Sequence, residues 1–414
     1  MTNSPLPRES TSRPSSEAAA RESTGARPHA VPARPWLPKS RSSGGPGGGQ
    51  QVRCGQPAQT DARTWVVVET LTGPDRPTTI LDGQNPRAFT KILRGSLGRN
   101  SAAARSLPEI IQRCADTAAI QDERVPRPGG AKVRIIAVPV AGPSGHVYAT
   151  TVWIGAEDEQ PPSRPLVGAI EWDTALVAQL SPDARLLTGA PRNDPPAQNT
   201  LPEVISWFDR WDDRADFLSM FNLVNPVDRW TGTATKYLGG VTHHFYIAAR
   251  AHNDGSGTRQ AVRAIVCDIT GHQPPVNPDL SSIAARNLPI QPGHALALVD
   301  LNAGVIHEWL ANSNDAIASW RHHTPLFHPD DQAQVATTCL DLLGGATWSA
   351  HTRTRLRLDP GDDWIPLQAR WSRISNDNRP QALIDVTPVG PVPPSVVDRC
   401  PTCRQHHRTD GSAA

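Results

Sequence analysis

The sequence predicts an α+β protein of three consecutive modules, each an antiparallel sheet with helices packed on one face, preceded by a disordered tail. Three observations predict this arrangement. The chain has 414 residues, enough for about two to four domains. Pairs of long strand-like runs around Gly- or Asn-rich turns recur at a spacing of roughly 110 residues. The first 61 residues are instead rich in Ser, Pro, Arg, Ala and Gly.

Both ends of the chain, residues 1–61 and 391–414, are expected to be flexible. The first segment ends in Ser-Ser-Gly-Gly-Pro-Gly-Gly-Gly at positions 42–49. Almost no side chain there can bury enough apolar area to offset the entropy cost of ordering the backbone. The folded modules are therefore expected between these two segments.

Residues 62–158 are expected to form the first and shortest module. A β-branched run opens it, and a Gly-Pro-Ser-Gly turn joins its last two strands. Between them, Ile110 and Cys114 share the apolar side of an expected helix. Pro108 fits the first turn of that helix, where a missing N–H is tolerated. The expected elements are strands 64–69 and 78–81, a helix at 107–119, and a hairpin of strands 132–140 and 146–154.

A proline-rich linker at 160–165 precedes the second module, residues 166–272. Asn-Asp-Gly-Ser-Gly at 253–257 is a strong turn signal between two long strands. Asn-Pro-Val-Asp at 225–228 is expected to begin a helix, in parallel with the third module. The expected elements are strands 167–173 and 175–180, a helix at 202–211, a helix carrying Phe217, Leu218 and Phe221, and strands 243–252 and 260–270.

The third module, residues 280–390, has the clearest pattern. His-Pro-Asp-Asp at 328–331 begins its main helix, with both carboxylates in the first turn, where the helix dipole favours them. Val335, Cys339 and Leu342 follow at helical spacing on one face. The other expected elements are strands 295–300 and 304–309, a short helix at 312–320, and strands 348–358, 364–374 and 382–387.

These motifs resemble sensor domains. The His-Pro-Asp-Asp helix start, the long strands after it and the ending Ile-Asp-Val-Thr at 384–387 resemble a PAS domain, and Val-Cys-Asp-Ile-Thr at 266–270 parallels that ending. The first module is similar to a trimmed GAF domain or a degenerate PAS domain. For the third module, another α+β domain with a helix packed on an antiparallel sheet is the alternative.

The order of a GAF-like and two PAS-like domains resembles an actinobacterial family of triple sensor-domain proteins. The motifs that carry this resemblance are Trp-Val-Val-Val-Glu at 65–69, the hairpin around 138–147 with Val-Trp-Ile-Gly at 152–155, and Val-Gly-Ala-Ile-Glu-Trp at 167–172. The resemblance implies sensor modules without a recognised output domain and without a defined ligand.

The composition of the chain limits its expected binding partners and its cellular compartment. The net charge of +1 gives no global electrostatic case for nucleic-acid binding. The six cysteines are scattered, and four of them are isolated, which favours a reducing compartment over a disulfide framework. No apolar run approaches the roughly 20 residues that cross a bilayer, and no signal peptide opens the chain. The sequence therefore predicts a cytoplasmic protein.

One cysteine cluster has a metal-like spacing. Cys400, Cys403, His406 and His407 lie close together near the end of the chain. A second Cys-x-x-Cys pair is missing, and adjacent histidines rarely both reach one ion. We therefore expect no metal, while the sequence leaves open whether these four residues hold one.

Cofactor chemistry has little support. Cys267 lies on an expected central strand, so a buried small hydrophobe is expected there rather than a reactive thiol. Haem would need an axial ligand that faces a pocket. Strand alternation places His243 with Phe245 inward and His244 with Tyr246 on the other face. The remaining histidines considered for this role are His307, His322, His323, His328 and His351.

A row of arginines marks the third module. Arg353, Arg355 and Arg357 alternate along one strand, with Arg370 and Arg373 on the next. We expect an exposed sheet face, for which Trp348, Trp364 and Trp371 supply apolar cover. The alternative is an anion pocket or a surface for an acidic partner, which requires the arginines to converge in a cavity.

No hydrolase, P-loop, zinc-protease or dinucleotide motif is present, so the sequence predicts no enzyme and no catalytic residues. We expect a non-enzymatic cytoplasmic signal-sensing protein that binds a small ligand, a protein partner or both, and that can form a homodimer. Trp153 or Trp309 could serve a dimer surface on the outer sheet face, or could as easily belong to the core, because large aromatic side chains usually bury. The alternatives are a structural adaptor without a ligand and an enzyme with an unfamiliar site. A filled apolar cavity favours the sensor, a packed solid core the adaptor, and a pocket with converging carboxylates or histidines of perturbed pKa the enzyme.

Overall fold

The structure is a computed structural model that describes residues 64–73, 76–91, 102–126, 130, 132–190, 199–222, 225–253, 259–276, 283–285, 287, 289–375 and 379–390. These residues belong to one compact unit, Thr60–Ala414. The expected flexible ends 1–61 and 391–414 lie outside the described residues, as do Cys54, Cys400, Cys403, His406, His407 and the turn at 254–258.

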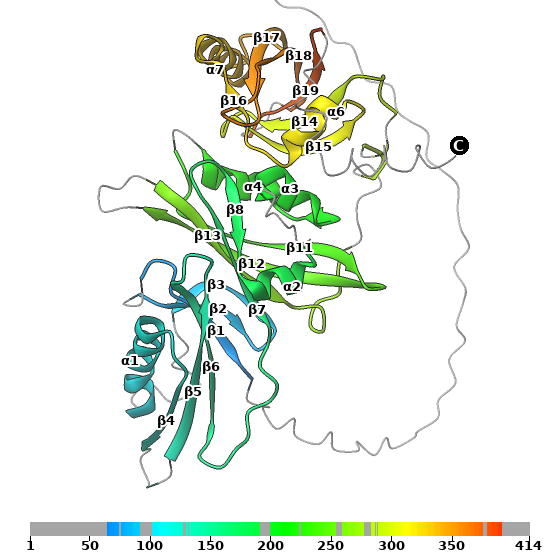
Figure 1. The fold of residues 1–414 in the computed structure, drawn as a ribbon. Helices are drawn as coiled ribbons and strands as arrows, with labels where there is room; N and C mark the ends of the chain where they lie inside the picture. The colour runs from blue at the N-terminus through cyan, green and yellow to red at the C-terminus, as the bar shows by residue number, and fades with distance from the viewer. Residues whose placement is uncertain are drawn as a thin grey trace, which may run out of the picture. The chain divides into compact units, whose positions relative to one another are not determined.

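Three antiparallel sheets dominate the described chain (Figure 1). Sheet A has the order β3-β2-β1-β6-β5-β4, sheet B the order β10-β11-β12-β13-β7-β8-β9, and sheet C the order β15-β14-β19-β18-β17-β16. In each sheet the first strand pairs with the last long strand in the middle, as β1 does with β6, β7 with β13 and β14 with β19. The predicted antiparallel sheets are confirmed, whereas the described chain has fewer helical residues and more strand than the predicted α+β modules.

Sheet A consists of β1 (Val66–Glu69), β2 (Thr78–Asp82), β3 (Asn85–Lys91), β4 (Gln121–Pro126), β5 (Lys132–Ala141) and β6 (Val147–Ala156). Sheet B consists of β7 (Val167–Trp172), β8 (Val177–Leu180), β9 (Asn199–Thr200), β10 (Arg210–Trp211), β11 (Arg229–Leu238), β12 (Val241–Asn253) and β13 (Arg259–Asp268). Sheet C consists of β14 (Ala295–Asp300), β15 (Val305–Asn312), β16 (Leu326–Phe327), β17 (Ser349–Arg357), β18 (Ile365–Arg373) and β19 (Gln381–Pro388).

The helix of the first module begins earlier than expected. It is α1 (Ala102–Thr117), so Pro108 lies inside it rather than in its first turn. The alanines before Pro108 are strong helix formers. The buried face that includes Ile110 and Cys114 packs on sheet A, which offsets the backbone hydrogen bond that the proline removes. The expected start at residue 107 was therefore wrong.

The second module departs most from expectation. The expected helix 202–211 ends early as α3 (Leu201–Ser206), because Asp209 N and Asp212 N bond to carbonyls of β11 instead. No helix begins at 225–228, since the following Thr-Gly-Thr-Ala-Thr run pairs along β12 as β11. The further helices are α2 (Pro182–Thr188), α4 (Arg214–Leu218) and η1 (Ser219–Phe221), the last two covering the expected Phe217, Leu218 and Phe221.

The main helix of the third module agrees with the sequence. It is α7 (Pro329–Leu343), and the His328 side chain caps its start by accepting from Asp330 N. Val335, Cys339 and Leu342 face the core of sheet C, as expected. The shorter α6 (Asp315–Ala318) and η2 (Ser319–Arg321) replace the expected helix 312–320.

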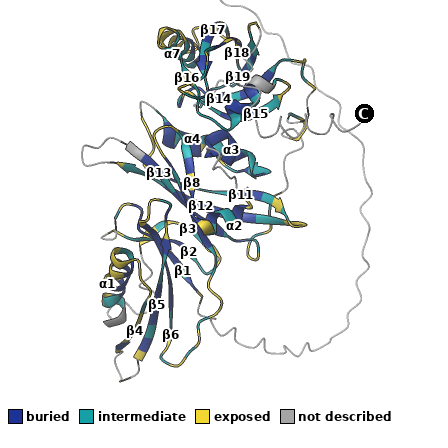
Figure 2. Cartoon of the chain, viewed as in Figure 1, coloured by how far each residue is buried: buried dark blue, intermediate teal, exposed yellow. Residues whose placement is uncertain are grey.

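Sheets A and B share one buried face. The core there joins Val67, Leu81 and Tyr148 of sheet A to Tyr246 and Ile265 of sheet B. The middle strands of both sheets are accordingly dark blue in Figure 2. The opposite face of sheet A carries α1, and the opposite face of sheet B carries α2, α3 and α4. Both faces of sheet B are thus covered.

A buried ion pair crosses this face. Glu69, which is fully buried, lies 3.0 Å from Arg250 Nη2. The same oxygen, Oε1, accepts from the Thr78 hydroxyl, and the other oxygen, Oε2, accepts from Leu71 N at 2.8 Å. The Arg250 guanidinium also lies over the Phe89 ring, 4.2 Å from its centroid. Both oxygens of this buried carboxylate therefore have hydrogen-bond or ion-pair partners inside the protein.

Candidate functional site

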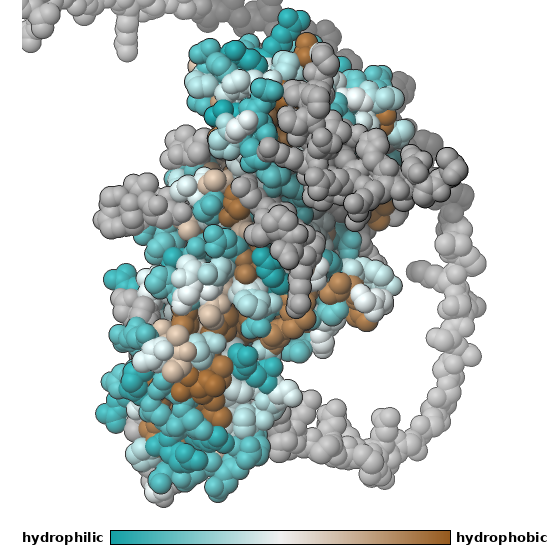
Figure 3. Space-filling view, viewed as in Figure 1, coloured by the Kyte–Doolittle hydropathy of each residue, from teal (hydrophilic) through white to brown (hydrophobic). Residues whose placement is uncertain are grey.

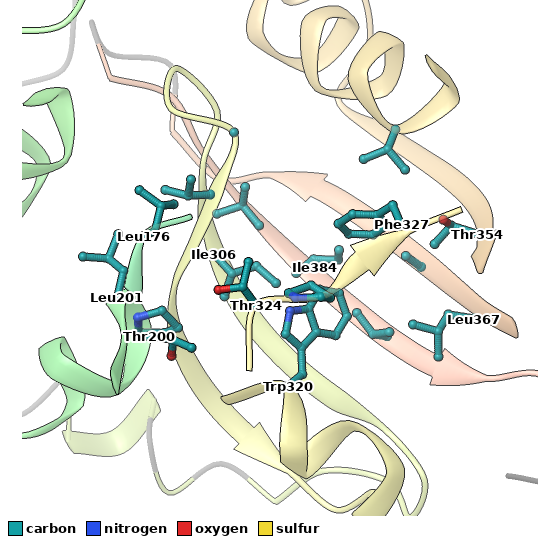
Figure 4. Close-up of a pocket in the computed structure, with 18 of the residues that line it drawn as sticks. Leu176, Thr200, Leu201, Ile306, Trp320, Thr324, Phe327, Thr354, Leu367 and Ile384 are labelled. Carbon is teal, nitrogen blue, oxygen red and sulfur yellow. The ribbon is translucent and has the colours of Figure 1, made fainter. Parts of the chain in front are cut away.

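A pocket of about 220 Å³ opens on the inner side of sheet C (Figure 4). An apolar cavity of about 150 Å³ holds a benzene molecule, so this pocket has room for a body of about two small fused rings. Its walls come from the inner face of sheet C, from α7, from the segment 320–327, and from residues of sheet B and α3. The apolar wall residues include Leu176, Leu201, Ile306, Trp309, Trp320, Phe327, Val335, Leu367, Ala369, Trp371, Ile384 and Val386.

Strand alternation forms the sheet wall of the pocket. On β18, Ile365, Leu367, Ala369 and Trp371 are buried, whereas the residues between them face outward. Ala369 is the smallest of the four, and its short side chain leaves space between Leu367 and Trp371. The pocket is therefore encoded by one small residue in a row of large ones.

A row of three aromatic rings forms a further part of the wall. The rings of Trp309 and Trp320 pack edge to face with centroids 5.3 Å apart, and Trp320 and Phe327 do so at 6.0 Å. Figure 4 shows Trp320 and Phe327 around the same space as Ile384 and Leu367. Edge-to-face packing fixes the ring planes, so the wall keeps its shape without a ligand.

The wall of the pocket contains almost no charged residue type. No Lys, Arg, Asp or Glu is among its residues, and its titratable side chains are His323 and Cys339. Burial raises the pKa of the Cys339 thiol to about 11, so the thiol is neutral at pH 7. Such a wall favours an uncharged, mainly apolar molecule, because a charged one would lose its hydration without compensation.

Sheet B completes the pocket. Ala175, Leu176, Thr200, Leu201 and Pro202 line its remaining side. The same region is joined to the 320–327 segment by polar contacts: Thr324 Oγ1 donates to Ala175 O at 3.0 Å, and Thr200 donates to Arg321 O. An ion pair between Arg214 of α4 and Glu308 of β15 is a further contact between the second and third modules. A bound molecule would touch both sides at once.

The expected inward histidine was wrong. His243 is partly exposed, stacks on Phe245 and contacts Asp268 at 3.1 Å, whereas His244 is the buried one. The reason is that sheet A covers the face of β12 that the sequence leaves looking like a solvent face. Neither histidine lines the sheet C pocket.

The arginines do not converge. Arg353 and Arg370 are exposed on the outer face of sheet C, and Asp331 holds Arg355 through two bonds of 2.9 Å. Arg373 lies on the other face and donates to Leu342 O. The exposed-face interpretation agrees with these positions, and the anion pocket is not formed by these side chains.

The tryptophans were partly misplaced by the sequence. Trp371 does not cover the arginine face but lies in the core, where its Nε1 donates to Thr352 Oγ1 at 2.9 Å. For Trp153 and Trp309 the sequence leaves open a dimer surface or the core, and both are buried. Large rings on strand positions covered by a helix or a second sheet pack inward, and the sequence does not show which positions are covered.

Cysteine and metal chemistry adds nothing to the pocket. Cys267 is buried on β13, as expected for a small hydrophobe, and burial raises the pKa of its thiol to about 12. Within the described ranges, no three His, Cys, Asp or Glu side chains gather as metal ligands do. The segment with Cys400, Cys403, His406 and His407 lies outside those ranges.

No described helix has the length and apolarity to span a membrane.

His307 gives a test of the boundary beside the pocket. It is buried on β15, with its Nε2 2.8 Å from Gln381 Oε1, and burial, reinforced by the nearby Arg214 charge, lowers its pKa to about 3. The unfolded chain therefore binds a proton near pH 6.5 that the folded chain does not bind until about pH 3. The contribution of His307 to the free energy of unfolding is fully present above pH 6.5. Below that pH it falls by about 1.4 kcal/mol per pH unit.

We expect the wild type to lose about 2 kcal/mol more than His307→Asn between pH 6.5 and pH 5. Urea unfolding at the two pH values measures this difference. Equal pH dependence in the two proteins would show that His307 titrates normally in the folded chain.

A comparison with known proteins finds a family match for part of this chain. Residues 64–163, which contain sheet A, match the family described as Rv3651-like, N-terminal. A solved structure of an uncharacterised protein from Mycobacterium tuberculosis is similar at a TM-score of 0.59 and 22% identity, covering 81% of this chain and 98% of that one. This likeness shows a shared fold, and its mycobacterial source agrees with the actinobacterial resemblance of the sequence. No curated protein matches the chain.

Similarity to sensory proteins is much weaker. An RNA-binding Light-Oxygen-Voltage receptor matches at a TM-score of 0.21 and 7% identity, covering 59% of this chain and 99% of that one. The periplasmic sensory domain of a Campylobacter jejuni chemoreceptor matches at 0.16 and 11%, covering 42% and 53%. At these scores neither protein carries an argument about function.

Proposed function

We propose that this protein is a non-enzymatic, cytoplasmic signal-sensing protein whose GAF/PAS-like modules bind a small ligand, and that the sheet C pocket is the ligand site. The observation that carries the proposal is an apolar pocket of about 220 Å³ whose walls hold no Lys, Arg, Asp or Glu side chain. The ligand is therefore a small, uncharged and mainly apolar molecule. The common strand order of the three sheets supports their interpretation as repeats of one module.

The position of the pocket supports sensing. Its walls come from sheet C and from the β7–β8 and β9–α3 regions of sheet B, so occupancy affects the contact between two modules. Thr324 and Thr200, which line the pocket, also make hydrogen bonds across that boundary. A change at the ligand can thus be passed to the neighbouring module and from there to a protein partner.

Sheets A and B favour a second role. Their shared core and the Glu69–Arg250 pair give them a solid, buried common face. This observation favours a structural adaptor role for these two modules, with ligand binding confined to sheet C. No group of strongly shifted acids and bases gathers among the described pocket residues, which gives no support to the enzyme alternative.

The pocket is tested with naphthol and naphthoate, two probes of similar size that differ in charge. We expect naphthol to bind the full chain and naphthoate to bind at least about tenfold more weakly, because no cation in the wall compensates the carboxylate. Isothermal calorimetry at pH 7 measures both affinities, and quenching of the wall tryptophans reports the location.

A filled pocket provides the control. Ala369→Phe places a ring in the space beside Trp371 and should abolish naphthol binding, whereas Gln368→Phe, one residue away on the exposed face, should not. Circular dichroism confirms that each variant is folded. Equal naphthol binding by wild type and Ala369→Phe would exclude this pocket as the ligand site.

A further inference from the structure

One part of the pocket wall lies outside the regular helices and strands. It is the segment 321–325 between η2 and β16, which we call the strap. His323, Thr324 and Pro325 of the strap line the pocket. Most of the remaining wall belongs to strands of sheet C and to α7 and α3, which regular backbone hydrogen bonds hold in place.

The backbone of the strap makes few hydrogen bonds. His322 N donates to Ser319 O at 3.0 Å, and residues 323–325 form no backbone–backbone hydrogen bond with other described residues. The strand that follows, β16, has only two residues and pairs with β17 alone. Segments with few backbone hydrogen bonds open at a lower free energy than the helices and strands around them. The strap is therefore the part of the wall that opens most easily.

Two hydroxyl groups hold the strap against the second module. Thr324 Oγ1 donates to Ala175 O at 3.0 Å, and the Thr200 hydroxyl donates to Arg321 O. Figure 4 shows Thr324 on the side of the pocket where Thr200 lies. The strap is thus fixed from its own side by Thr324 and from the side of sheet B by Thr200.

A buried ion pair completes this attachment. His322 Nδ1 of the strap pairs with Glu203 Oε2 of α3, and we call this pair the latch. Both atoms are buried, and neither has a further hydrogen-bond partner in the described part of the chain. Glu203 directly follows the wall residues 200–202 but does not itself line the pocket. Loss of the latch therefore loosens the strap without removing a side chain from the pocket wall.

We propose that the strap is the gate of the sheet C pocket, and that small molecules enter and leave when the latch and the Thr324 hydrogen bond open. This inference rests on the sheet C pocket being the ligand site. It adds a conformational step to binding, and it assigns to Glu203 control over the rate at which the ligand exchanges.

Stopped-flow mixing of the full chain with naphthol, followed by quenching of the wall tryptophans, measures both rate constants. We expect Glu203→Ala to raise the association and dissociation rate constants about tenfold each, because opening no longer breaks the latch. The dissociation constant should change less than about twofold, since the filled and the empty closed states lose the same contact. A variant that was merely less stable would not associate faster.

Asp183→Ala is the matched control. Asp183 lies in the first turn of α2, as Glu203 does in α3, and it forms no ion pair or hydrogen bond with the strap. We expect both rate constants of this variant to equal those of the wild type. Thr324→Val removes the other attachment and should also raise both rate constants, which keeps the test open if Glu203→Ala does not fold.

Three results would overturn the gate. Wild-type rate constants in Glu203→Ala and Thr324→Val would place the entrance elsewhere in the wall. A rise in the dissociation rate constant alone would make these contacts part of the filled state only. Failure of naphthol to bind the wild type would reject the ligand site itself, and the gate with it.

Discussion

Glu69→Ala should destabilise the protein by about 3–5 kcal/mol, among the largest losses expected from one substitution in this chain. The carboxylate is fully buried, lies 3.0 Å from Arg250 Nη2 and accepts a hydrogen bond from Leu71 N. Its removal leaves the Arg250 guanidinium, whose side chain is 12% exposed, without its counter-charge between sheets A and B. Urea unfolding followed by tryptophan fluorescence measures the loss.

Two controls separate the buried charge from the lost contacts. The double variant Glu69→Leu with Arg250→Met should be less destabilised than Glu69→Ala, since neither charge stays buried alone. Asp122→Asn removes a carboxylate from the exposed pair with Arg134 and should cost less than about 1 kcal/mol. A Glu69→Ala loss as small as that of Asp122→Asn would contradict the buried shared face of sheets A and B.

Trp172→Ala should also destabilise by about 3–5 kcal/mol, through the cavity that it leaves in the core of sheet B. The Trp172 side chain is fully buried at the end of β7. Its ring packs edge to face against Phe217 with centroids 5.4 Å apart, and against Phe221 at 6.3 Å. The substitution removes these contacts together with the apolar burial, and thermal and urea unfolding both report the change.

Trp348→Ala is the matched control. Trp348 is 58% exposed and contacts the Arg373 guanidinium at 5.5 Å from its ring centroid. An exposed contact of this kind contributes about 0.5–1 kcal/mol, so its loss should be several times smaller than that of Trp172. Similar losses for the two variants would mean that the helices α4 and η1 do not pack on sheet B as described.

The long, strongly patterned elements could be predicted from the sequence. α7 was predicted because its carboxylates, capping residue and apolar spacing all agree. The hairpins β5–β6 and β12–β13 were predicted because alternation and turn residues coincide. The two-residue strands β9, β10 and β16 were not, since their positions depend on neighbouring strands rather than on local pattern.

The pocket could not be predicted, although some of its residues had been singled out. The sequence suggests Trp309 as a possible dimer residue, Trp371 as apolar cover of the arginine face, and Cys339 as part of a helix face. Ala369 and Trp320 line the pocket together with Leu176 and Leu201, which precede strand β8 and follow strand β9 of sheet B. These are contacts between distant segments, and no spacing rule along one strand shows them. The inward choice of His243 failed for the same reason, because sheet A covers the other face of β12.

The central claim is that the sheet C pocket holds one small neutral molecule. Native mass spectrometry of the full chain in the presence of naphthol tests it most directly, because it counts bound molecules. We expect one naphthol per wild-type chain, one per Gln368→Phe chain and none per Ala369→Phe chain. Wild-type chains without added mass, or Ala369→Phe chains that still carry one naphthol, would contradict the claim.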